Sequence, residues 1–116
     1  MTQDKINGMY RAIDTLDAKG FVANFTDDAK FIIGNDTIIN GKDNILKYIE
    51  EFFNSINIIR HFDMKEIVKD DVVVVYGSSQ YTRKDGSFIL VPFCDILEVW
   101  KGQIKQYHIY NDLSKL

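Results

Sequence analysis

Residues 87–101 form a long segment that is apolar on both faces of any strand it can form. Successive side chains of a strand point to opposite faces, so alternate residues share a face. One face carries Ile89, Val91, Phe93, Asp95, Leu97 and Val99, and the other carries Leu90, Pro92, Cys94, Ile96, Glu98 and Trp100. Because an antiparallel sheet usually leaves one face in water, this strand needs unusual cover. Helices can cover one face, and a second copy of the chain is the simplest cover for the other, so we expect a homodimer through the sheet.

In the residues before this segment, the spacing of apolar side chains predicts three helices. Apolar residues repeat at helical spacing at Ile6, Met9, Tyr10, Ile13 and Leu16. A short second helix is expected from Asp17 through Phe25, ended by the turn residues 26–28. Capping residues at 40–43 precede a third helix with a broad apolar face over residues 45–56.

The residues outside these helices show patterns typical of β-strands. Runs at 30–34 and 37–39 flank the turn residues Gly34-Asn35-Asp36 and predict a hairpin. Four longer strands are expected near 60–69, 72–83, 87–101 and 103–111. The order of elements predicts an α+β fold in which the helices cover one face of a mostly antiparallel sheet.

Size and charge narrow the possible functions. A chain of 116 residues supports one hydrophobic core, so residues 1–116 are expected to form a single domain. The net charge is −3 and no cluster of Lys and Arg is present, so a nucleic-acid partner is not expected. Apolar runs are too short to span a membrane and no secretory signal is visible, so we expect a cytoplasmic protein. The lone Cys94 excludes an internal disulfide and a cysteine-rich zinc cluster, and no cofactor is expected.

Six segments resemble the SnoaL-like proteins of the nuclear transport factor 2-like superfamily. They are YRAIDTLD (10–17), FTDDA (25–29), NGKDNI (40–45), RHF (60–62), DILEVW (95–100) and YHIYND (107–112). The resemblance covers nearly the whole chain. It implies a cone-like fold in which a curved mixed sheet and three N-terminal helices on its concave face enclose a pocket, usually with dimerisation through the sheet. Relatives include isomerases, dehydratases, cyclases and noncatalytic association domains, so the fold alone does not assign a reaction.

Asp95 is the strongest candidate for a catalytic residue. It is the one charged residue on an otherwise apolar strand face, and a buried carboxylate must be protonated or find hydrogen-bond donors. By resemblance it occupies the position of the oxyanion-hole aspartic acid of ketosteroid isomerase. That residue is a well-known example of a carboxylic acid kept neutral so that it can donate a hydrogen bond. The alternative is a structural aspartate bonded to a neighbouring strand or to the first helix.

Three further residues are candidates for acid/base chemistry. His61 matches the histidine of dehydratase-type relatives in the RHF segment, and imidazole suits proton transfer near neutral pH. Strand alternation groups His61 with Asp63 and Lys65, opposite Phe62, so the rim of the pocket is an alternative position. Asp14 and Tyr10 lie four residues apart on the first helix, and the dehydratases carry similar residues there. An ordinary helix end explains this spacing equally well.

Other patterns argue against specific chemistries. Residues 31–34 lack the carboxylate that serves as general base in the steroid isomerases, and Asn35 and Asp36 would need a register shift to replace it. The sequence Arg83-Lys84-Asp85 resembles an epoxide hydrolase spacing but reads as a hairpin turn. His108 and Asp112 lack a third metal ligand, so no metal site is expected.

The sequence therefore predicts a pocket protein for a small apolar, oxygenated molecule. As an enzyme it is expected to be a cofactor-independent lyase, isomerase or cyclase in which His61 moves a proton near Asp14, while Asp95 and Tyr10 polarise a carbonyl or hydroxyl. The alternative is a noncatalytic ligand-binding or association module. A catalytic site requires His61, Asp14 and Asp95 to surround one cavity. The residues expected to line that cavity are Phe93, Leu97, Ile33, Tyr107, Ile109, Asn111 and Phe53.

Overall fold

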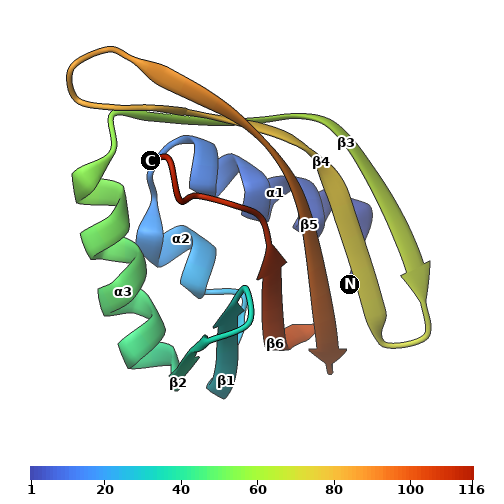
Figure 1. Cartoon of the computed structure of the whole chain (residues 1–116). Helices are drawn as coiled ribbons and strands as arrows, with labels where there is room; N and C mark the ends of the chain where they lie inside the picture. The colour runs from blue at the N-terminus through green and yellow to red at the C-terminus, as the bar shows by residue number, and fades with distance from the viewer.

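The computed structural model describes all 116 residues and folds them into three helices against one curved, six-stranded sheet (Figure 1). The helices are α1 (Gln3–Asp14), α2 (Ala18–Val22) and α3 (Lys42–Ser55). The strands are β1 (Phe25–Ile33), β2 (Thr37–Asn40), β3 (Ile58–Lys69), β4 (Val72–Thr82), β5 (Phe88–Trp100) and β6 (Gln103–Tyr110). Their order in the sheet is β2-β1-β6-β5-β4-β3, with β1 parallel to β6 and every other pair antiparallel. The predicted α+β class is confirmed.

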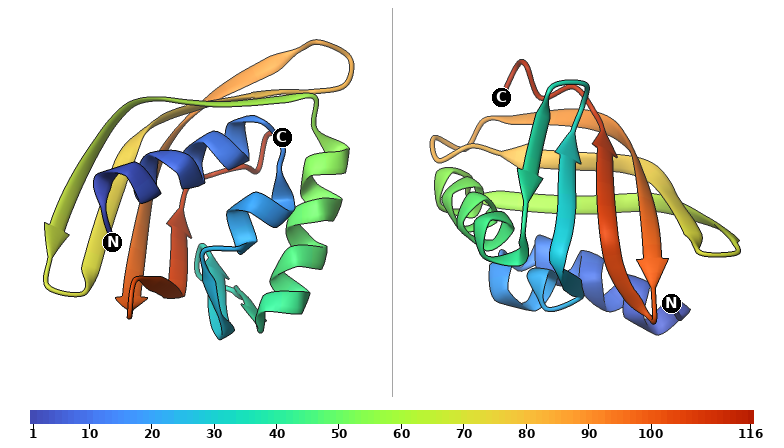
Figure 2. Two further views of the ribbon diagram at one scale, coloured as in Figure 1. Left: turned by 180° about the vertical axis from the view of Figure 1, so that it is seen from behind. Right: turned by 90° about the horizontal axis from the view of Figure 1, so that it is seen from below.

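All three helices lie on the concave side of the sheet (Figure 2). The side chain of Thr2 caps α1 by accepting a hydrogen bond from the backbone N–H of Lys5, and Asp17 caps α2 in the same way through Gly20. Between the two caps, Leu16 adopts a left-handed conformation with φ of 56°, which turns the chain from one helix into the next. The apolar stripe of α1 is thereby held against the sheet.

The second helix is shorter than the sequence predicts. It ends at Val22, and Phe25 already belongs to β1. The side-chain amide of Asn24 donates to the backbone carbonyls of Gly20 and Phe21, which closes the helix. Phe25 then pairs with Ile104 of β6, so its backbone continues in the sheet while its ring packs on Phe21. The prediction that Phe25 lies in the helix and that 26–28 end it was therefore wrong.

A β-bulge interrupts the regular alternation of β3. The pairing with β4 shifts register between Phe62 and Lys65, and Asp63 has a φ of 53°. Opposite the bulge, a Cβ on Gly77 would lie 2.9 Å from the backbone oxygens of Phe62 and Asp63, so only glycine fits there. The bulge breaks the expected grouping of His61 with Asp63 and Lys65.

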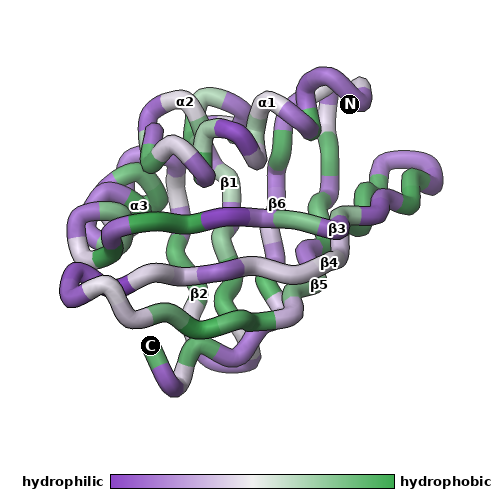
Figure 3. Tube along the Cα trace, turned by 90° about the horizontal axis from the view of Figure 1, so that it is seen from above, coloured by the Kyte–Doolittle hydropathy of each residue, from purple (hydrophilic) through white to green (hydrophobic).

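The two faces of the sheet differ strongly. The inward residues of β5 from Val91 to Val99 are buried, whereas Leu90 and Trp100 on the outer face are 60% and 53% exposed. Figure 3 shows the apolar start of β5 beside a more polar stretch of β4. Exposed apolar side chains are also present on β3 and β4, at Ile67, Val68 and Val72. None of the three helices is both long and apolar enough to cross a membrane.

Candidate active site

A cavity of about 80 Å³, counted as space open to the centres of water molecules, lies between the concave face of the sheet and the helices. A single water needs roughly 10–15 Å³ on this measure, so the cavity has room for a small organic molecule. Fourteen of its seventeen lining residues are hydrophobic, and the other three are His61, Asp95 and Asn111. The cavity is therefore an apolar enclosure with a few polar groups, the usual composition of a small-molecule site.

Asp95 lies at the centre of a cluster of three buried oxygen-bearing side chains. The hydroxyl of Tyr10 in α1 donates to Oδ2 of Asp95 at 2.6 Å, and that of Tyr107 in β6 donates to the same oxygen at 2.8 Å. The two hydroxyls are 3.2 Å apart. Oδ1 of Asp95 is buried and has no hydrogen-bond partner. One oxygen of the carboxyl group is thus held by two phenols, and the other is buried without a hydrogen-bond partner.

Burial controls the protonation of this cluster. It raises the pKa of Asp95 to about 6, against the opposing hydrogen bonds from Tyr10 and Tyr107 and the nearby charge of His61. Burial also raises the pKa of each tyrosine well above its ordinary value of 10.0, so both phenols stay protonated and act as donors. Asp95 is the member of the cluster that can gain or lose a proton near neutral pH.

A second polar group is formed by His61 at the start of β3 and Asp14 at the end of α1. Nδ1 of His61 lies 2.6 Å from Oδ1 of Asp14, and the backbone N–H of His61 donates to Oδ2 at 3.1 Å. An ionised carboxylate only accepts hydrogen bonds, so this contact places a proton on Nδ1, and in the neutral ring the lone pair is then on Nε2. Nε2 has no protein partner among the hydrogen bonds of the structure.

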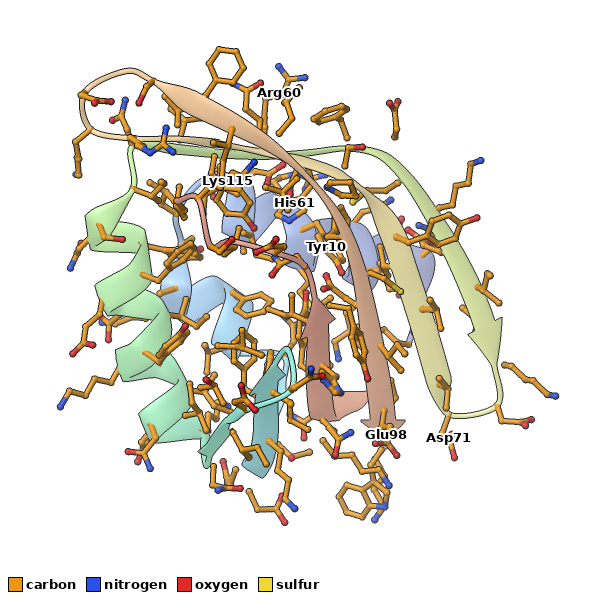
Figure 4. The ribbon with its side chains drawn as sticks, viewed as in Figure 1. Tyr10, Arg60, His61, Asp71, Glu98 and Lys115 are labelled. Carbon is orange, nitrogen blue, oxygen red and sulfur yellow. The ribbon has the colours of Figure 1, made fainter.

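Aromatic rings fix the plane of the imidazole. The ring of His61 meets Tyr10 edge-on at 5.2 Å and Phe93 at 4.9 Å. Arg60 and His61 are neighbours in β3, and Figure 4 shows Arg60 above the outer face of the sheet and His61 beneath it, on the side of α1 and Tyr10. The side chain of His61 is only 6% exposed. It lines the cavity and does not lie on the outer surface.

The structure brings the four sequence candidates together, in two roles. His61 and Asp95 line the cavity, whereas Tyr10 and Asp14 do not and reach it only through their bonds to Asp95 and His61. Six of the seven residues expected to line the cavity do so, namely Phe93, Ile33, Tyr107, Ile109, Asn111 and Phe53. Leu97 does not, because it is fully buried in the core one step further along β5.

Sequence reasoning missed several features of the site. It treated Tyr107 as a lining residue and gave no sign that its hydroxyl bonds to Asp95. It also missed five aromatic lining residues, which are Phe21, Phe31, Tyr48, Phe52 and Tyr81. Alternation could have found Tyr81, since Val73, Val75, Ser79 and Tyr81 share one face of β4 and are all buried.

Solved structures share the fold at low sequence identity. An NTF2-like protein of unknown function from Burkholderia pseudomallei superposes with a TM-score of 0.86 at 17% identity, covering 99% of this chain and 95% of that one. A protein with a ketosteroid isomerase-like fold from Catenulispora acidiphila, solved in complex with trimethylamine, gives 0.86 at 16%, with 98% and 89% covered. A candidate polyketide cyclase from Pseudomonas putida gives 0.84 at 19%, with 98% and 94% covered.

Sequence comparison assigns the family. No curated protein matches the chain significantly. The SnoaL-like domain, in contrast, matches residues 6–107, which include Tyr10, Asp14, His61, Asp95 and Tyr107. Fold and sequence agree over nearly the full length, and the chain belongs to the SnoaL-like domain family.

Proposed function

We propose that this protein is a cofactor-independent acid/base enzyme, a lyase, isomerase or cyclase, acting on a small apolar, oxygenated molecule. One observation carries the proposal: His61 and Asp95 face the same otherwise apolar cavity, and each is held by a residue of α1 that does not line it, Asp14 and Tyr10 respectively. An imidazole with a free Nε2 and a carboxyl group with a free Oδ1 supply one base and one acid. Proton transfer by such positioned groups is the core of this chemistry.

The reaction follows from the two free atoms. Nε2 of His61 takes a proton from the carbon next to a carbonyl group, and the C–H electrons form a C=C bond. The carbonyl oxygen takes the proton of the protonated Asp95 and becomes an enol hydroxyl. If the substrate has a C=C bond β,γ to the carbonyl, His61 returns its proton to the γ-carbon and gives an isomer. If it has a hydroxyl on the β-carbon, His61 protonates that hydroxyl, which leaves as water. In both cases the enol O–H returns its proton to Asp95 as the carbonyl group re-forms. Both side chains then regain their starting protonation.

The partner residues have positioning roles in this proposal. Asp14 keeps the proton of His61 on Nδ1 and fixes the ring, as a carboxylate behind an imidazole does in other acid/base enzymes. Tyr10 and Tyr107 hold Oδ2 of Asp95, so Tyr10 acts through Asp95 and does not touch the substrate. This differs from the sequence-based expectation that Tyr10 itself polarises the substrate.

Two structural neighbours support a small-molecule site in this fold. The Pseudomonas protein is described as a candidate cyclase, and the Catenulispora protein was solved with a small amine. A noncatalytic ligand-binding module remains the alternative function. It differs in one measurable respect, because a binding module holds a ligand without exchanging its protons.

The experiment is deuterium exchange at the α-carbons of cyclohexanone in D₂O, followed by NMR. Saturation transfer first establishes that the ketone occupies the cavity. The native protein is expected to exchange these protons faster than buffer, and His61→Gln to lower that rate by about 10²-fold. His108→Gln is the matched control, because His108 bonds to the backbone oxygen of Gly34 and does not line the cavity. A ketone that binds but exchanges no faster than in buffer would establish the binding module instead.

We also propose that two copies pair through the outer face of the sheet. Leu90, Trp100 and Ile67 are each more than half exposed there, and apolar residues of this size cluster at interfaces. Light scattering at micromolar concentration is expected to give the mass of a dimer. Leu90→Glu is expected to give a folded monomer, whereas Glu51→Lys on the exposed side of α3 leaves the mass unchanged. A native protein that stays monomeric rejects this pairing.

A further inference from the structure

The cavity contains an acidic group but no lysine or arginine to balance it. Asp95 is 2% exposed, and no lysine or arginine is among the lining residues. The one imidazole in the cavity lining, that of His61, already has its Nδ1 bonded to Asp14. An ionised Asp95 therefore leaves the cavity with uncompensated negative charge, which is costly in an apolar setting.

The residues packed around Asp95 do not satisfy its second oxygen. Tyr10 approaches from α1, His61 from β3, Tyr81 from β4 and Tyr107 from β6, while Asp14 bonds to His61. Both phenol donors that reach Asp95 bond to Oδ2, and Oδ1 is buried without a partner. A buried unpaired acceptor is a strong reason for a ligand to present a hydrogen-bond donor.

The walls of the cavity favour a positive charge. Eight of the seventeen lining residues are phenylalanine or tyrosine. Aromatic rings attract organic cations through their quadrupole, and they also cover the hydrocarbon part of such a ligand. Charge, hydrogen bonding and packing therefore favour the same class of ligand.

We propose that, with Asp95 ionised, this cavity binds small apolar ammonium ions, whose N–H donates to Oδ1 of Asp95 while the hydrocarbon part packs on the aromatic walls. The inference goes beyond the proposed function, because it concerns equilibrium binding and holds whether or not His61 transfers a proton. Carboxylate ligands of the same shape are excluded, since they meet Asp95 without a compensating cation.

Protonation of Asp95 reverses the preference. Burial raises the pKa of Asp95 to about 6, so ammonium binding is fully present above that pH and is lost as the pH falls through it. The protonated carboxyl group donates a hydrogen bond instead, which suits the carbonyl substrate proposed above. The two ligand classes thus need opposite protonation states of one residue.

Three probes with one hydrocarbon body test this inference: benzylamine, benzyl alcohol and benzoate. Calorimetric titration at pH 8 is expected to give an affinity for benzylamine on the order of tenfold higher than for benzyl alcohol, since an ionic hydrogen bond is about twice as strong as a neutral one. Benzoate is expected to show no binding. In Asp95→Asn the amine is expected to bind no more tightly than the alcohol, while the affinity for the alcohol itself is kept. Asp71→Asn, an exposed turn residue far from the cavity in Figure 4, removes the same charge and is the control.

A pH titration gives a second test that needs no variant to fold. The affinity of the native protein for benzylamine is expected to fall between pH 7 and pH 5, while that for benzyl alcohol stays level. The inference is overturned if benzoate binds as well as benzylamine, if Asp95→Asn keeps the amine preference, or if amine affinity is equal at pH 5 and pH 8. None of these results affects ketone exchange at His61, which tests the proposed function separately.

Discussion

Two aspartates flank the cavity in opposite environments. Asp95 lies in the middle of β5, is 2% exposed and accepts hydrogen bonds from two phenols on one oxygen. Asp14 ends α1, has a side chain that is 26% exposed, and uses both oxygens to hold one histidine. The same functional group therefore serves two purposes. The buried one can change its protonation state near neutral pH, and the other orients a base.

The difference in burial explains why the two aspartates have different roles in one site. Desolvation is the largest cause of the raised pKa of Asp95, and it comes from the core that surrounds the side chain. At Asp95, therefore, the same burial that stabilises the fold also sets the protonation of the carboxyl group. Asp14 is partly exposed, and what it contributes to the site is the orientation of His61. Four predictions test this difference.

The largest expected loss of stability is at Tyr107, which holds the buried Asp95. Its ring is 1% exposed and stacks on Phe25 and Phe31, so Tyr107→Ala is expected to lower the free energy of unfolding by about 3–5 kcal/mol. Tyr107→Phe keeps the ring, loses the hydroxyl and should cost about 1–3 kcal/mol. Urea denaturation measures both. A loss below roughly 1 kcal/mol for Tyr107→Ala would place this cluster outside the cooperative core.

The next effect is a dependence of stability on pH that comes from Asp95. Its pKa is about 6 in the folded chain, and the ordinary value for an aspartate is 3.8, so between these pH values the folded state holds more protons than the unfolded state. The free energy of unfolding contributed by this group therefore decreases as the pH rises through that window, by about 3 kcal/mol in all.

Comparison with Asp95→Asn isolates this contribution. The variant cannot ionise at this position, so the difference in unfolding free energy between it and the native protein should change with pH across the same window. At pH 7 the variant should be no less stable than the native protein, because it avoids a buried charge. A variant destabilised at pH 7 by about 1.5–3 kcal/mol would instead mark Asp95 as a structural carboxylate held by charge-assisted hydrogen bonds.

A smaller effect is expected at Tyr10. Removing its hydroxyl with Tyr10→Phe should cost about 1–2 kcal/mol. The hydrogen bond from Tyr10 lowers the pKa of Asp95, so this variant should also raise that pKa further. Carboxyl carbon NMR of labelled aspartate follows the titration. Tyr48→Phe is the control, because Tyr48 lines the cavity without bonding to Asp95, and an equal shift in both variants would contradict the assignment.

The smallest change in stability is expected at Asp14. Because its side chain is partly exposed, Asp14→Asn should cost less than about 1 kcal/mol of unfolding free energy. The same substitution replaces one of the two acceptor oxygens by an NH2 group that only donates, so the side chain can no longer accept from both the backbone N–H and Nδ1 of His61. Ketone exchange should therefore slow although the fold is kept. Equal exchange rates in the native and variant proteins would remove Asp14 from the proposed mechanism.

Local patterns predicted most of the fold. The apolar spacing of Ile6, Met9 and Tyr10 and the alternation in residues 87–101 correctly predicted which elements form and which face of β5 is buried. The end of α2 was missed because it depends on the Asn24 side chain and on pairing with β6, which lies far along the chain. Periodicity carries no information about such contacts.

The site was less accessible to sequence reasoning for the same reason. Tyr10 and Asp95 are 85 residues apart, and His61 and Asp14 are 47 apart, so each pair depends on how the helices pack on the sheet. Asp95 could be singled out because a charge on an apolar strand face is visible without a partner. Tyr107 could not, because a tyrosine on an apolar face is ordinary until its hydroxyl is seen to bond.

The bulge in β3 has a consequence for variation in chain length. Ile59 and His61 face inward before it and Met64 and Glu66 lie on the less exposed side after it, so Asp63 is one residue more than regular alternation requires. A homologue lacking this residue would keep its histidine in place and bring the rest of the strand into simple alternation. It would also have no need of glycine at the position of Gly77. Relatives can thus differ by one residue here, and in the identity of the residue opposite, while sharing the same site.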